Sequence, residues 1–506
     1  MTRMQRRRIQ MAERKEQKKA HLKAQAELRR KQAIEGLRGT RHITADNAKC
    51  EYQTHSEEIE ARQEMVKDYC RVLQKSLPGL LIRLSKVKDY RNPKKTKHKV
   101  AVILLLGIFW FVFQKSSRRQ ANEELTNPTF LENMRLFFPE LESLPHHDTV
   151  NRFLCMIDIN QLEDVLASII KDFIRSKKFQ NYLIDKCVPI AIDGTQKHTY
   201  DFLWSEECLE RTRNEKTQYY CYTLEASLVF QNGIILPLFT EFLDFMQGDE
   251  LRNKQDCEVN AFKRLAEKIK AYFPRLKIIL LIDGIYANGP VMEICRKYKW
   301  QFMIVLKDDS LPCVWEEFNA LKNFDDNRNN RHSRKWGNRR QRFIWVNDIC
   351  HVYDQMRKEE IVHIVVCEEE WEEVSENAQI ITQHKKFAWI SSEPLNRLNL
   401  HQRCNLGGRS RWVIENGGFL VEKRHGYQYE HAFSLNWNAM KGFHVLMRIG
   451  HLINVLAQHS NLLRSLCIKK GMKAFIKFMD ETFRLFRLNL EWIRNCLAEN
   501  YQVRYF

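Results

Sequence analysis

The chain has 506 residues, of which 44% are hydrophobic, and it carries 82 Lys or Arg against 63 Asp or Glu, a formal net charge of +19. Such a length can bury a large core in roughly two to four structural units. The basic excess favours a polyanionic partner, because each cation that neutralises a phosphate releases a condensed counterion; the alternative is a basic surface that binds nothing.

The cysteines and the apolar segments argue against secreted and membrane proteins. The 14 cysteines are scattered singly, unlike a disulfide scaffold, and indicate reduced thiols in a cytoplasmic protein. No apolar segment follows the charged amino terminus, so no secretory signal is expected. The longest apolar run, 100–113, has 14 residues, whereas a bilayer span needs about 20. This run is therefore predicted to be a buried core helix, and no membrane partner is expected.

The first two regions in chain order are a basic arm, 1–45, and a helical region, 46–186. Up to His42 the arm holds fourteen Lys or Arg against four Glu and has no apolar stripe, which predicts a solvated helix or a disordered segment. Either form can lie along a DNA backbone or serve only as a solubilising tail. Apolar residues three and four apart indicate helices over 51–186. A helical region before the predicted strands suits the recognition of a DNA end.

A Pro-His-His-Asp sequence lies inside this helical region, at 145–148. Asp148 is predicted to cap the helix that follows. His146 and His147 are adjacent, so their side chains diverge in a helix or a strand. Loop or cap roles are therefore favoured over metal binding for both histidines.

Strand signals begin after Lys186 and predict an α/β architecture for 187–309, a mixed sheet covered by helices. An apolar strand beginning at Val188 is predicted to end on Asp193, and a hairpin is predicted over 218–243 around an Asn-Gly turn. The later elements are expected to be a helix over 255–272, a strand over 277–283, a helix over 289–298 and a strand over 301–306.

Residues 310–399 are predicted to form a β-rich insertion, because apolar β-type segments alternate with polar loops. Its first loop, 328–342, holds six Arg and one Lys around Trp336. Basic side chains interleaved with an aromatic can neutralise phosphates and stack on an unpaired base; an exposed loop with a packed Trp is the alternative. The residues predicted to contact DNA here are Arg334, Lys335, Trp336, Arg339 and Arg340.

Three carboxylates are candidates for a metal-binding site. Asp193 and Asp283 each follow a short apolar strand and precede a Gly, so the sheet would fix the carboxylate while the Gly permits close approach. Glu415 has Arg411 four residues before it and Lys423 eight after it, on one face if the segment is helical. Such carboxylates can hold the paired metal ions of phosphodiester chemistry, while Arg411 and Lys423 are predicted to contact the phosphates of DNA. Taken alone, Arg411 and Glu415 are most simply a surface ion pair.

Other carboxylates and a lysine follow the predicted hairpin. Lys254, Asp256 and Glu258 are predicted to support the site or to be structural, because none of them ends an apolar strand.

Two further patterns leave alternatives open. Cys208, Cys221 and His198 can be imagined as zinc ligands, but their spacing matches no standard zinc finger. The last region, 436–506, has helical apolar spacing that suits either a core face or a dimer contact.

Five short stretches, spread from 144 to 419, carry a family resemblance. They are LPHHDTVNRFL (144–154), AIDGTQ (191–196), KQDCEVNAFKR (254–264), IDGIYAN (282–288) and RWVIENGGF (411–419). In this order they resemble the DDE transposases of bacterial insertion sequences, specifically the cut-and-paste branch with a β-rich insertion between its second and third acidic residues.

The resemblance implies an RNase H-like core in which Asp193, Asp283 and Glu415 form the acidic triad. It further implies that this triad binds two Mg²⁺ or Mn²⁺ ions, which prefer oxygen ligands. The third acid would lie on a helix of the core within 400–435, and 436–506 would be a carboxyl-terminal helical region.

The family pattern around the third acid also contains a Tyr, an Arg and a Lys. Arg411 fits the Arg position. Gly408 stands at the Tyr position, and Glu422 stands at the Lys position with Lys423 one residue beyond it. The phosphate-clamping roles of this segment are therefore less well matched than the triad.

For function, the resemblance implies a DNA transposase that cleaves the ends of an insertion sequence and joins them to target DNA, acting in the nucleoid of a bacterium. Its partners would be the terminal inverted repeats, the target DNA and a second copy of the chain. Two alternatives stay open: another metal-dependent nuclease on the same fold, and a catalytically inactive DNA-binding derivative, against which three intact acids count.

Overall fold

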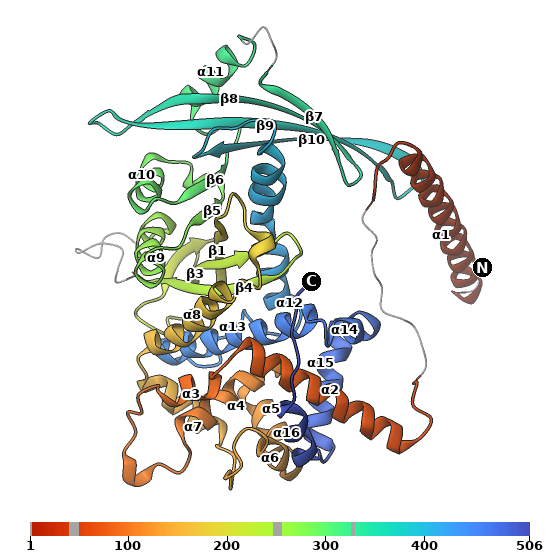
Figure 1. Cartoon of the computed structure of the whole chain (residues 1–506), viewed down its shortest axis with the longest axis vertical. Coiled ribbons are helices and arrows are strands. Elements are labelled where there is room, and N and C mark those ends of the chain that lie inside the picture. Colours follow the sequence, from red (N-terminus) through yellow and green to blue (C-terminus); the bar gives the residue numbers. More distant parts are fainter. Residues whose placement is uncertain (1–2, 40–49, 246–255, 325–328) are drawn as a thin grey trace. The chain divides into compact units, whose positions relative to one another are not determined.

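A computed structural model describes residues 3–39, 50–245, 256–324 and 329–506 (Figure 1). The chain divides into two compact units, each assembled from separate segments. The first unit contains the amino-terminal segment up to Ile43 together with 283–296 and 301–408. The second unit contains 44–282, 297–300 and 409–506.

The second unit is built on a mixed sheet. Its strands are β1 (Val188–Tyr200), β2 (Leu209–Arg213), β3 (Lys216–Val229), β4 (Ile235–Leu243) and β5 (Ile278–Ile282). β3 lies antiparallel to β1 on one side and to β2 and β4 on the other, and β1 pairs in parallel with β5. The mixed α/β architecture is confirmed, as is the hairpin predicted over 218–243, which β3 and β4 form with Gly233 at a positive φ of 85° in the turn.

The first strand continues beyond the residue at which it was predicted to end. β1 runs to Tyr200, because β3 supplies antiparallel partners as far as the pair of Tyr200 with Tyr219. What stops is the parallel neighbour: β5 ends at Ile282, which pairs with Ile192. The prediction that the strand ends on Asp193 is therefore wrong. An Asp-Gly pair resembles a strand end in the sequence, but here it lies within a long antiparallel ladder.

Helices from two distant parts of the chain pack together in the second unit. The amino-terminal set comprises α2 (His55–Ser76), α3 (Leu80–Ser85), α4 (Val100–Val112), α5 (Arg118–Glu124), α6 (Pro128–Met134), α7 (His147–Met156) and α8 (Ile159–Arg175). The later set comprises α9 (Glu258–Tyr272), α12 (Leu420–Arg424), α13 (Trp437–His459), α14 (Arg464–Lys470), α15 (Met472–Leu485) and α16 (Leu490–Ala498). α8, α9 and α13 lie against β4, so they cover the sheet.

α4 is a core helix, as predicted. All of its residues are buried, and it packs against α13, where the rings of Trp110 and Phe443 stack at 5.9 Å. A side-chain carbon at Gly107 would lie 2.7 Å from Leu446, so the two helices approach closely because this position is a glycine. Within the part of the chain that the structure describes, no helix has the length and apolar character required to cross a bilayer.

The apolar spacing of the carboxyl-terminal region belongs to the interior of this unit. The buried side chains are Phe443, Leu446, Ile449, Leu452, Ile453, Leu456, Phe475, Phe478 and Phe483. Burial of these side chains within the unit fits the core interpretation of the spacing, while Phe486 of the same pattern is half-buried.

The first unit contains an antiparallel sheet in the region predicted to be β-rich. Its strands are β6 (Gln301–Val305), β7 (Arg331–Trp336), β8 (Arg339–Tyr353), β9 (Lys358–Val374) and β10 (Ile380–Ser391), in the order β6-β10-β9-β8-β7. Its helices are α1 (Arg3–Ile34), α10 (Gly289–Tyr298) and α11 (Pro312–Leu321). The basic arm is thus helical over α1, one of the two forms predicted for it.

The predicted basic loop over 328–342 is instead a β-hairpin over the residues described there. β7 and β8 pair from Arg331 to Trp336, with Gly337 at a positive φ of 59° in the turn. Charged side chains concealed the strand pattern, because β9 places glutamates opposite β8, as in the pair of Arg340 with Glu370. Such cross-strand charge pairs stabilise a sheet without apolar alternation.

Candidate active site

Asp193 and Asp283 continue from neighbouring positions of the sheet in the second unit. Ile192 and Ile282 are partners in the parallel pairing of β1 with β5. Asp193 follows the first of them within β1, and Asp283 follows the second in the chain. The pairing of the two strands ends one residue before both aspartates, and Asp283 is the first residue after β5 that belongs to the first unit.

Asp193 and Glu415 meet through one buried arginine. The Nη1 atom of Arg411 lies 3.1 Å from the Asp193 carboxylate and 2.6 Å from the Glu415 carboxylate. The Arg411 side chain is 3% exposed, against 18% for Asp193 and 34% for Glu415. The pair predicted from the four-residue spacing is thus not a surface ion pair, because its cation is buried and shared with β1.

This arrangement leaves negative charge incompletely balanced. Burial is the main cause that raises the pKa of Asp193 to about 7; Arg411 opposes the rise and the Glu415 carboxylate adds to it. Two carboxylates share one guanidinium, and the Nε atom of Arg411 has no hydrogen-bond partner among the described residues. Oxygen donors that a single cation leaves underneutralised suit a hard divalent ion.

The segment that carries Glu415 has a wide helical turn and lies close to the sheet. Residues Ile414–Phe419 form a π-helical turn, a form frequent at functional sites. A side-chain carbon at Gly418 would lie 3.0 Å from the Cδ1 atom of Ile235 in β4. Close packing therefore accounts for a glycine in a helix here, where its helix propensity is poor.

Asp283 has its own cation in the first unit. It is the N-cap residue of the short turn Gly284–Tyr286, and the Nζ atom of Lys307 lies 3.2 Å from its carboxylate. Its side chain is 28% exposed, so it is open to a ligand. A side-chain carbon at Gly284 would lie 2.9 Å from Lys307, which shows how closely that lysine covers the turn.

Lys423, predicted to contact DNA, is engaged within the protein. Its Nζ atom donates a hydrogen bond to the main-chain oxygen of Gln196 at 2.9 Å and lies 3.8 Å from the Glu430 carboxylate. The lysine thus joins α12 to β1 three residues after Asp193.

Glu422, at the position where the resemblance suggested a lysine, is buried. Arg448 lies 3.2 Å and His451 lies 2.6 Å from its carboxylate. Burial opposes ionisation of Glu422, but Arg448 and His451 outweigh it and hold the pKa at about 2. This carboxylate therefore ties α12 to α13.

A buried polar network beside Asp193 was missed by the sequence reasoning. Glu225 is the partner of Asp193 in the pairing of β3 with β1, and it is fully buried. Arg448 and His444 of α13 pair with it, and Tyr429 donates a hydrogen bond to it at 2.5 Å. The spacing of His444, Arg448 and His451 on one face of an apolar helix is the signal that could have indicated such a network.

The basic residues of the insertion line a groove of about 850 Å³ on its sheet. Its cationic lining residues are Arg334, Lys335, Arg340, Arg342, Lys385 and Lys386, with Glu368, Glu369 and Glu370 between them. Arg339 pairs with Glu369 at 2.8 Å, and Trp336 is half-buried with its ring 6.4 Å from that of His401. Of the residues of the insertion predicted to contact DNA, Arg334, Lys335 and Arg340 therefore line one groove, where glutamates offset part of their charge, whereas Trp336 and Arg339 do not line it.

Asp256 and Glu258, two of the predicted supporting residues, have different partners. Asp256 pairs with Arg264 at 2.5 Å. Glu258 accepts a hydrogen bond from Tyr222 at 2.6 Å, and a side-chain carbon at Gly194 would lie 2.8 Å from its carboxylate. Glu258 is thus adjacent to the residue after Asp193. Lys254 lies outside the described residues.

The imagined zinc site has no structural support. Cys208 and Cys221 belong to an apolar cluster with Trp437 and Met440, and burial raises their pKa values to about 11 and about 12. Among the described residues, three ligand atoms within 4.8 Å of one another are found at His146, His147 and Asp148, and neither these thiols with His198 nor Asp193, Asp283 and Glu415 meet that criterion. Burial that disfavours the thiolate also disfavours metal binding.

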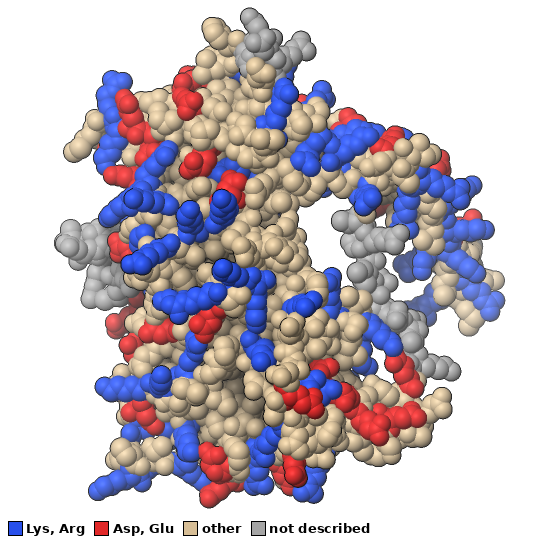
Figure 2. Space-filling model, in the orientation of Figure 1, with Lys and Arg blue, Asp and Glu red and all other residues tan. Residues whose placement is uncertain are grey.

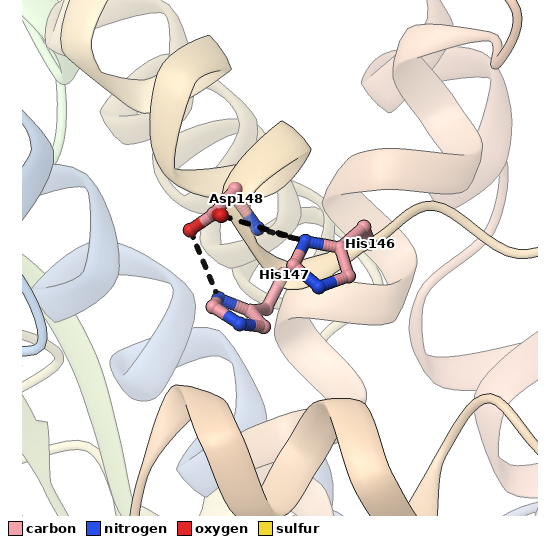
Figure 3. A group of neighbouring side chains, drawn as sticks. All are labelled: His146, His147 and Asp148. Atoms are coloured by element: carbon pink, nitrogen blue, oxygen red, sulfur yellow. Dashed lines mark hydrogen bonds and ion pairs between the residues drawn. The ribbon is translucent and has the colours of Figure 1, made fainter.

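Figure 3 shows His146, His147 and Asp148 at the start of α7. Their ligand atoms lie within 4.8 Å of one another. The Nδ1 atom of His146 accepts a hydrogen bond from the Asp148 N–H at 3.2 Å, so His146 is the N-cap and the prediction of Asp148 as the cap is wrong. An imidazole nitrogen can accept as a carboxylate does. The Arg118 guanidinium, 3.8 Å from Asp148, and the positive helix terminus both disfavour a metal ion.

The family match concerns the helical region of the second unit. Residues 81–170, which extend from α3 to α8, match the family described as DDE_Tnp_1-associated, a domain found in DDE transposase families. A stretch of 126 residues, 25% of this chain, is 30% identical to the protein YbfL of Escherichia coli (strain K12), whose name states no activity. The match spans 31% of the length of that protein. The family match supports a transposase-related protein.

Proposed function

We propose that this chain is a DDE transposase with an RNase H-like core, in which Asp193, Asp283 and Glu415 bind two Mg²⁺ or Mn²⁺ ions. The observation that carries the proposal is the meeting of Asp193 and Glu415 at Arg411, beside the strand pair that leads into Asp283. The family match over 81–170 supports the same class of protein.

The residues of the chain have distinct roles in this proposal. Asp193, fixed by its strand, and Glu415, fixed by close packing of its turn against β4, supply oxygen ligands of defined position. Arg411 orients both carboxylates through its Nη1 atom. When bound, the ions would activate water or a DNA 3′-hydroxyl and stabilise the leaving oxygen.

The DNA partners in this proposal are the terminal inverted repeats of an insertion sequence and a target duplex. The groove on the insertion supplies cations for this contact, and Trp336 follows Lys335 of its lining in β7. We further propose that two copies of the chain pair the two ends, since both ends must be cut and joined together.

The test incubates the full chain with Mg²⁺ and a duplex that carries the inverted repeats flanking its gene. We expect end cleavage and joining to a second duplex. The variants Asp193→Asn, Asp283→Asn and Glu415→Gln should lose both reactions and keep end binding, whereas Glu293→Gln, which alters an exposed ion pair with Lys358, should retain them.

The outcomes separate the proposed function from its alternatives. Cleavage without preference for the repeats and without joining would indicate a different metal-dependent nuclease. Binding without any cleavage by the unaltered protein would indicate an inactive DNA-binding derivative. A variant of the triad that cut at the normal rate would remove its residue from the site.

A further inference from the structure

The basic helix α1 is attached to the insertion by its carboxyl-terminal end. Ala24 and Leu28 are buried there, and Leu37 is buried just beyond the helix. Lys31 pairs with Glu372 of β9, and Glu35 pairs with Arg340 of β8. The main-chain N–H of Arg38 donates to the oxygen of Gly337 at 2.8 Å. These contacts hold one end of the helix on the sheet of the first unit.

The remainder of the helix has no such support. Every residue from 3 to 20 is exposed. The whole of α1 holds twelve Lys or Arg against three Glu, a net charge of twelve minus three, or +9. A helix that is polar on all sides has little packing to stabilise it, and among the described residues the ion pair found on α1 is at its carboxyl-terminal end, at Lys31.

The charges of α1 are unevenly distributed around it. With 3.6 residues per turn, successive residues advance by about 100°. On that basis nine of the twelve basic residues fall within one half of the circumference, and these are Arg3, Arg7, Arg8, Arg14, Lys15, Lys18, Lys19, Arg29 and Arg30. The three acids, Glu13, Glu16 and Glu27, fall in the other half. Figure 2 shows Lys and Arg side chains gathered along the helix.

We propose that α1 is a sequence-independent docking arm for the backbone of duplex DNA, held on the insertion by its carboxyl-terminal end. This inference rests on the proposed function and deepens it, because it assigns DNA contact to a surface separate from the acidic site. Like charges four residues apart, such as Arg14 with Lys18 and Lys15 with Lys19, repel one another on a bare helix. Phosphates remove that repulsion and release counterions.

The dimensions of the helix suit a duplex. At about 1.5 Å per residue, α1 is roughly 48 Å long, and its exposed part, 3–20, is roughly 27 Å long. With base pairs about 3.4 Å apart, the exposed part alone can follow roughly eight base pairs. Arg340 and Lys335 both contact Glu35, the residue that follows α1, and both also line the basic groove. The arm and the groove are therefore adjoining surfaces.

A membrane surface fits this helix less well. An interfacial helix needs a continuous apolar face opposite its charges. The exposed apolar side chains of α1, which are Met4, Ile9, Met11, Leu22 and Ile34, are separated by charged and polar residues and make no such face.

The test compares full-length proteins on a random-sequence duplex of about 30 base pairs, without Mg²⁺, over a range of salt concentrations. One variant changes Arg7, Arg8, Arg14, Lys15, Lys18 and Lys19 to Gln. Its control exchanges Arg for Lys and Lys for Arg at the same six positions, which preserves the charge. All six side chains are exposed, so circular dichroism and thermal unfolding should confirm an unchanged fold.

We expect the Gln variant to bind at least about 10-fold more weakly and to lower the slope of log K against log salt by about 2 or more, at roughly 0.9 per lost phosphate contact. The exchange control should bind as the unaltered protein does. Equal affinity and slope for the Gln variant would overturn the proposal. So would a loss confined to duplex RNA, or one confined to vesicles of phosphatidylserine and phosphatidylcholine, because each would name a different partner.

The result remains distinct from the test of the proposed function. Asp193→Asn keeps the arm and should bind the random duplex normally. Failure of the unaltered protein to cut DNA with Mg²⁺ would overturn the transposase proposal and leave the arm's binding difference intact. Normal cutting together with unchanged binding by the Gln variant would overturn the arm alone.

Discussion

Charge is arranged in opposite ways at two places in the molecule. One is the site of Asp193 and Glu415 around Arg411 in the second unit, here called the acidic edge, and the other is the basic helix α1 of the first unit. Around Asp193 the charges are few and fixed by specific partners, because two partly buried carboxylates share the buried guanidinium of Arg411. Along α1, over residues 3–20, they are numerous and exposed. A buried charge acts through its position, whereas exposed charges act through their number. Substitutions should therefore have large and residue-specific effects at the acidic edge and small, cumulative effects on basic surfaces.

The largest effect is expected at Arg448, because its guanidinium compensates both Glu225 and Glu422 in the interior. Arg448→Met would leave two buried carboxylates without that cation and should lower the free energy of unfolding by about 3–5 kcal/mol. Urea unfolding followed by circular dichroism measures the change. A loss below about 1 kcal/mol would show that the network tolerates isolated charges and would weaken the contrast with exposed surfaces.

The next effect concerns Arg411, which should affect activity more than stability. Arg411→Ala removes the group that orients Asp193 and Glu415, and we expect DNA cleavage to fall about 100-fold, or roughly 3 kcal/mol in barrier height. Mn²⁺ affinity should not fall, because the two carboxylates lose a competing cation. Arg411→Lys keeps the charge but cannot reproduce a guanidinium shared between two carboxylates, so it should recover little activity. Unchanged cleavage by Arg411→Ala would contradict this role.

A smaller effect is expected from Gly418→Ala, for which the chain provides a matched control. The added carbon would lie 3.0 Å from Ile235, so the Glu415 turn would shift from β4, and overpacking should lower stability by about 1–2 kcal/mol. Gly417→Ala meets its nearest neighbour at 3.7 Å, an ordinary contact, and should be tolerated. Thermal unfolding and cleavage assays on both variants measure the difference. Equal behaviour would show that close packing does not position Glu415.

The smallest effect is expected in the groove of the insertion. Arg334 and Lys385 line it, and neighbouring glutamates already offset part of its charge. The double change Arg334→Gln with Lys385→Gln should weaken binding of duplex DNA only a few-fold and reduce its salt dependence slightly. Fluorescence anisotropy at two salt concentrations measures this. A loss of 100-fold or more would show that these side chains act by position, as those of the acidic edge do.

Local patterns predicted much of this molecule from its sequence. The Asn-Gly hairpin of β3 and β4, the core helix α4 and the spacing of Arg411 and Glu415 depend on neighbouring residues, which the sequence displays directly. The end of β1 could not be predicted in this way, because the length of that strand is set by β3, a partner about thirty residues later.

The errors at charged residues have a common physical cause. The hairpin of β7 and β8 was predicted as a loop because its stability depends on glutamates of β9 rather than on apolar alternation. The network around Glu225 was missed because the sequence does not show whether a glutamate is buried or exposed. Its burial depends on α13, which supplies His444 and Arg448 as partners. His146 as a cap was missed because an imidazole seldom takes that position.

The proposed transposase activity requires the carboxylates of Asp193, Asp283 and Glu415 to act as one divalent-cation site. Isothermal titration of the full-length protein with Mn²⁺, without DNA, measures this directly. We expect saturable binding that Asp193→Asn, Asp283→Asn and Glu415→Gln each weaken at least about 10-fold, with Glu293→Gln unchanged. Binding by the three variants that equalled that of the unaltered protein would contradict a metal site at these residues.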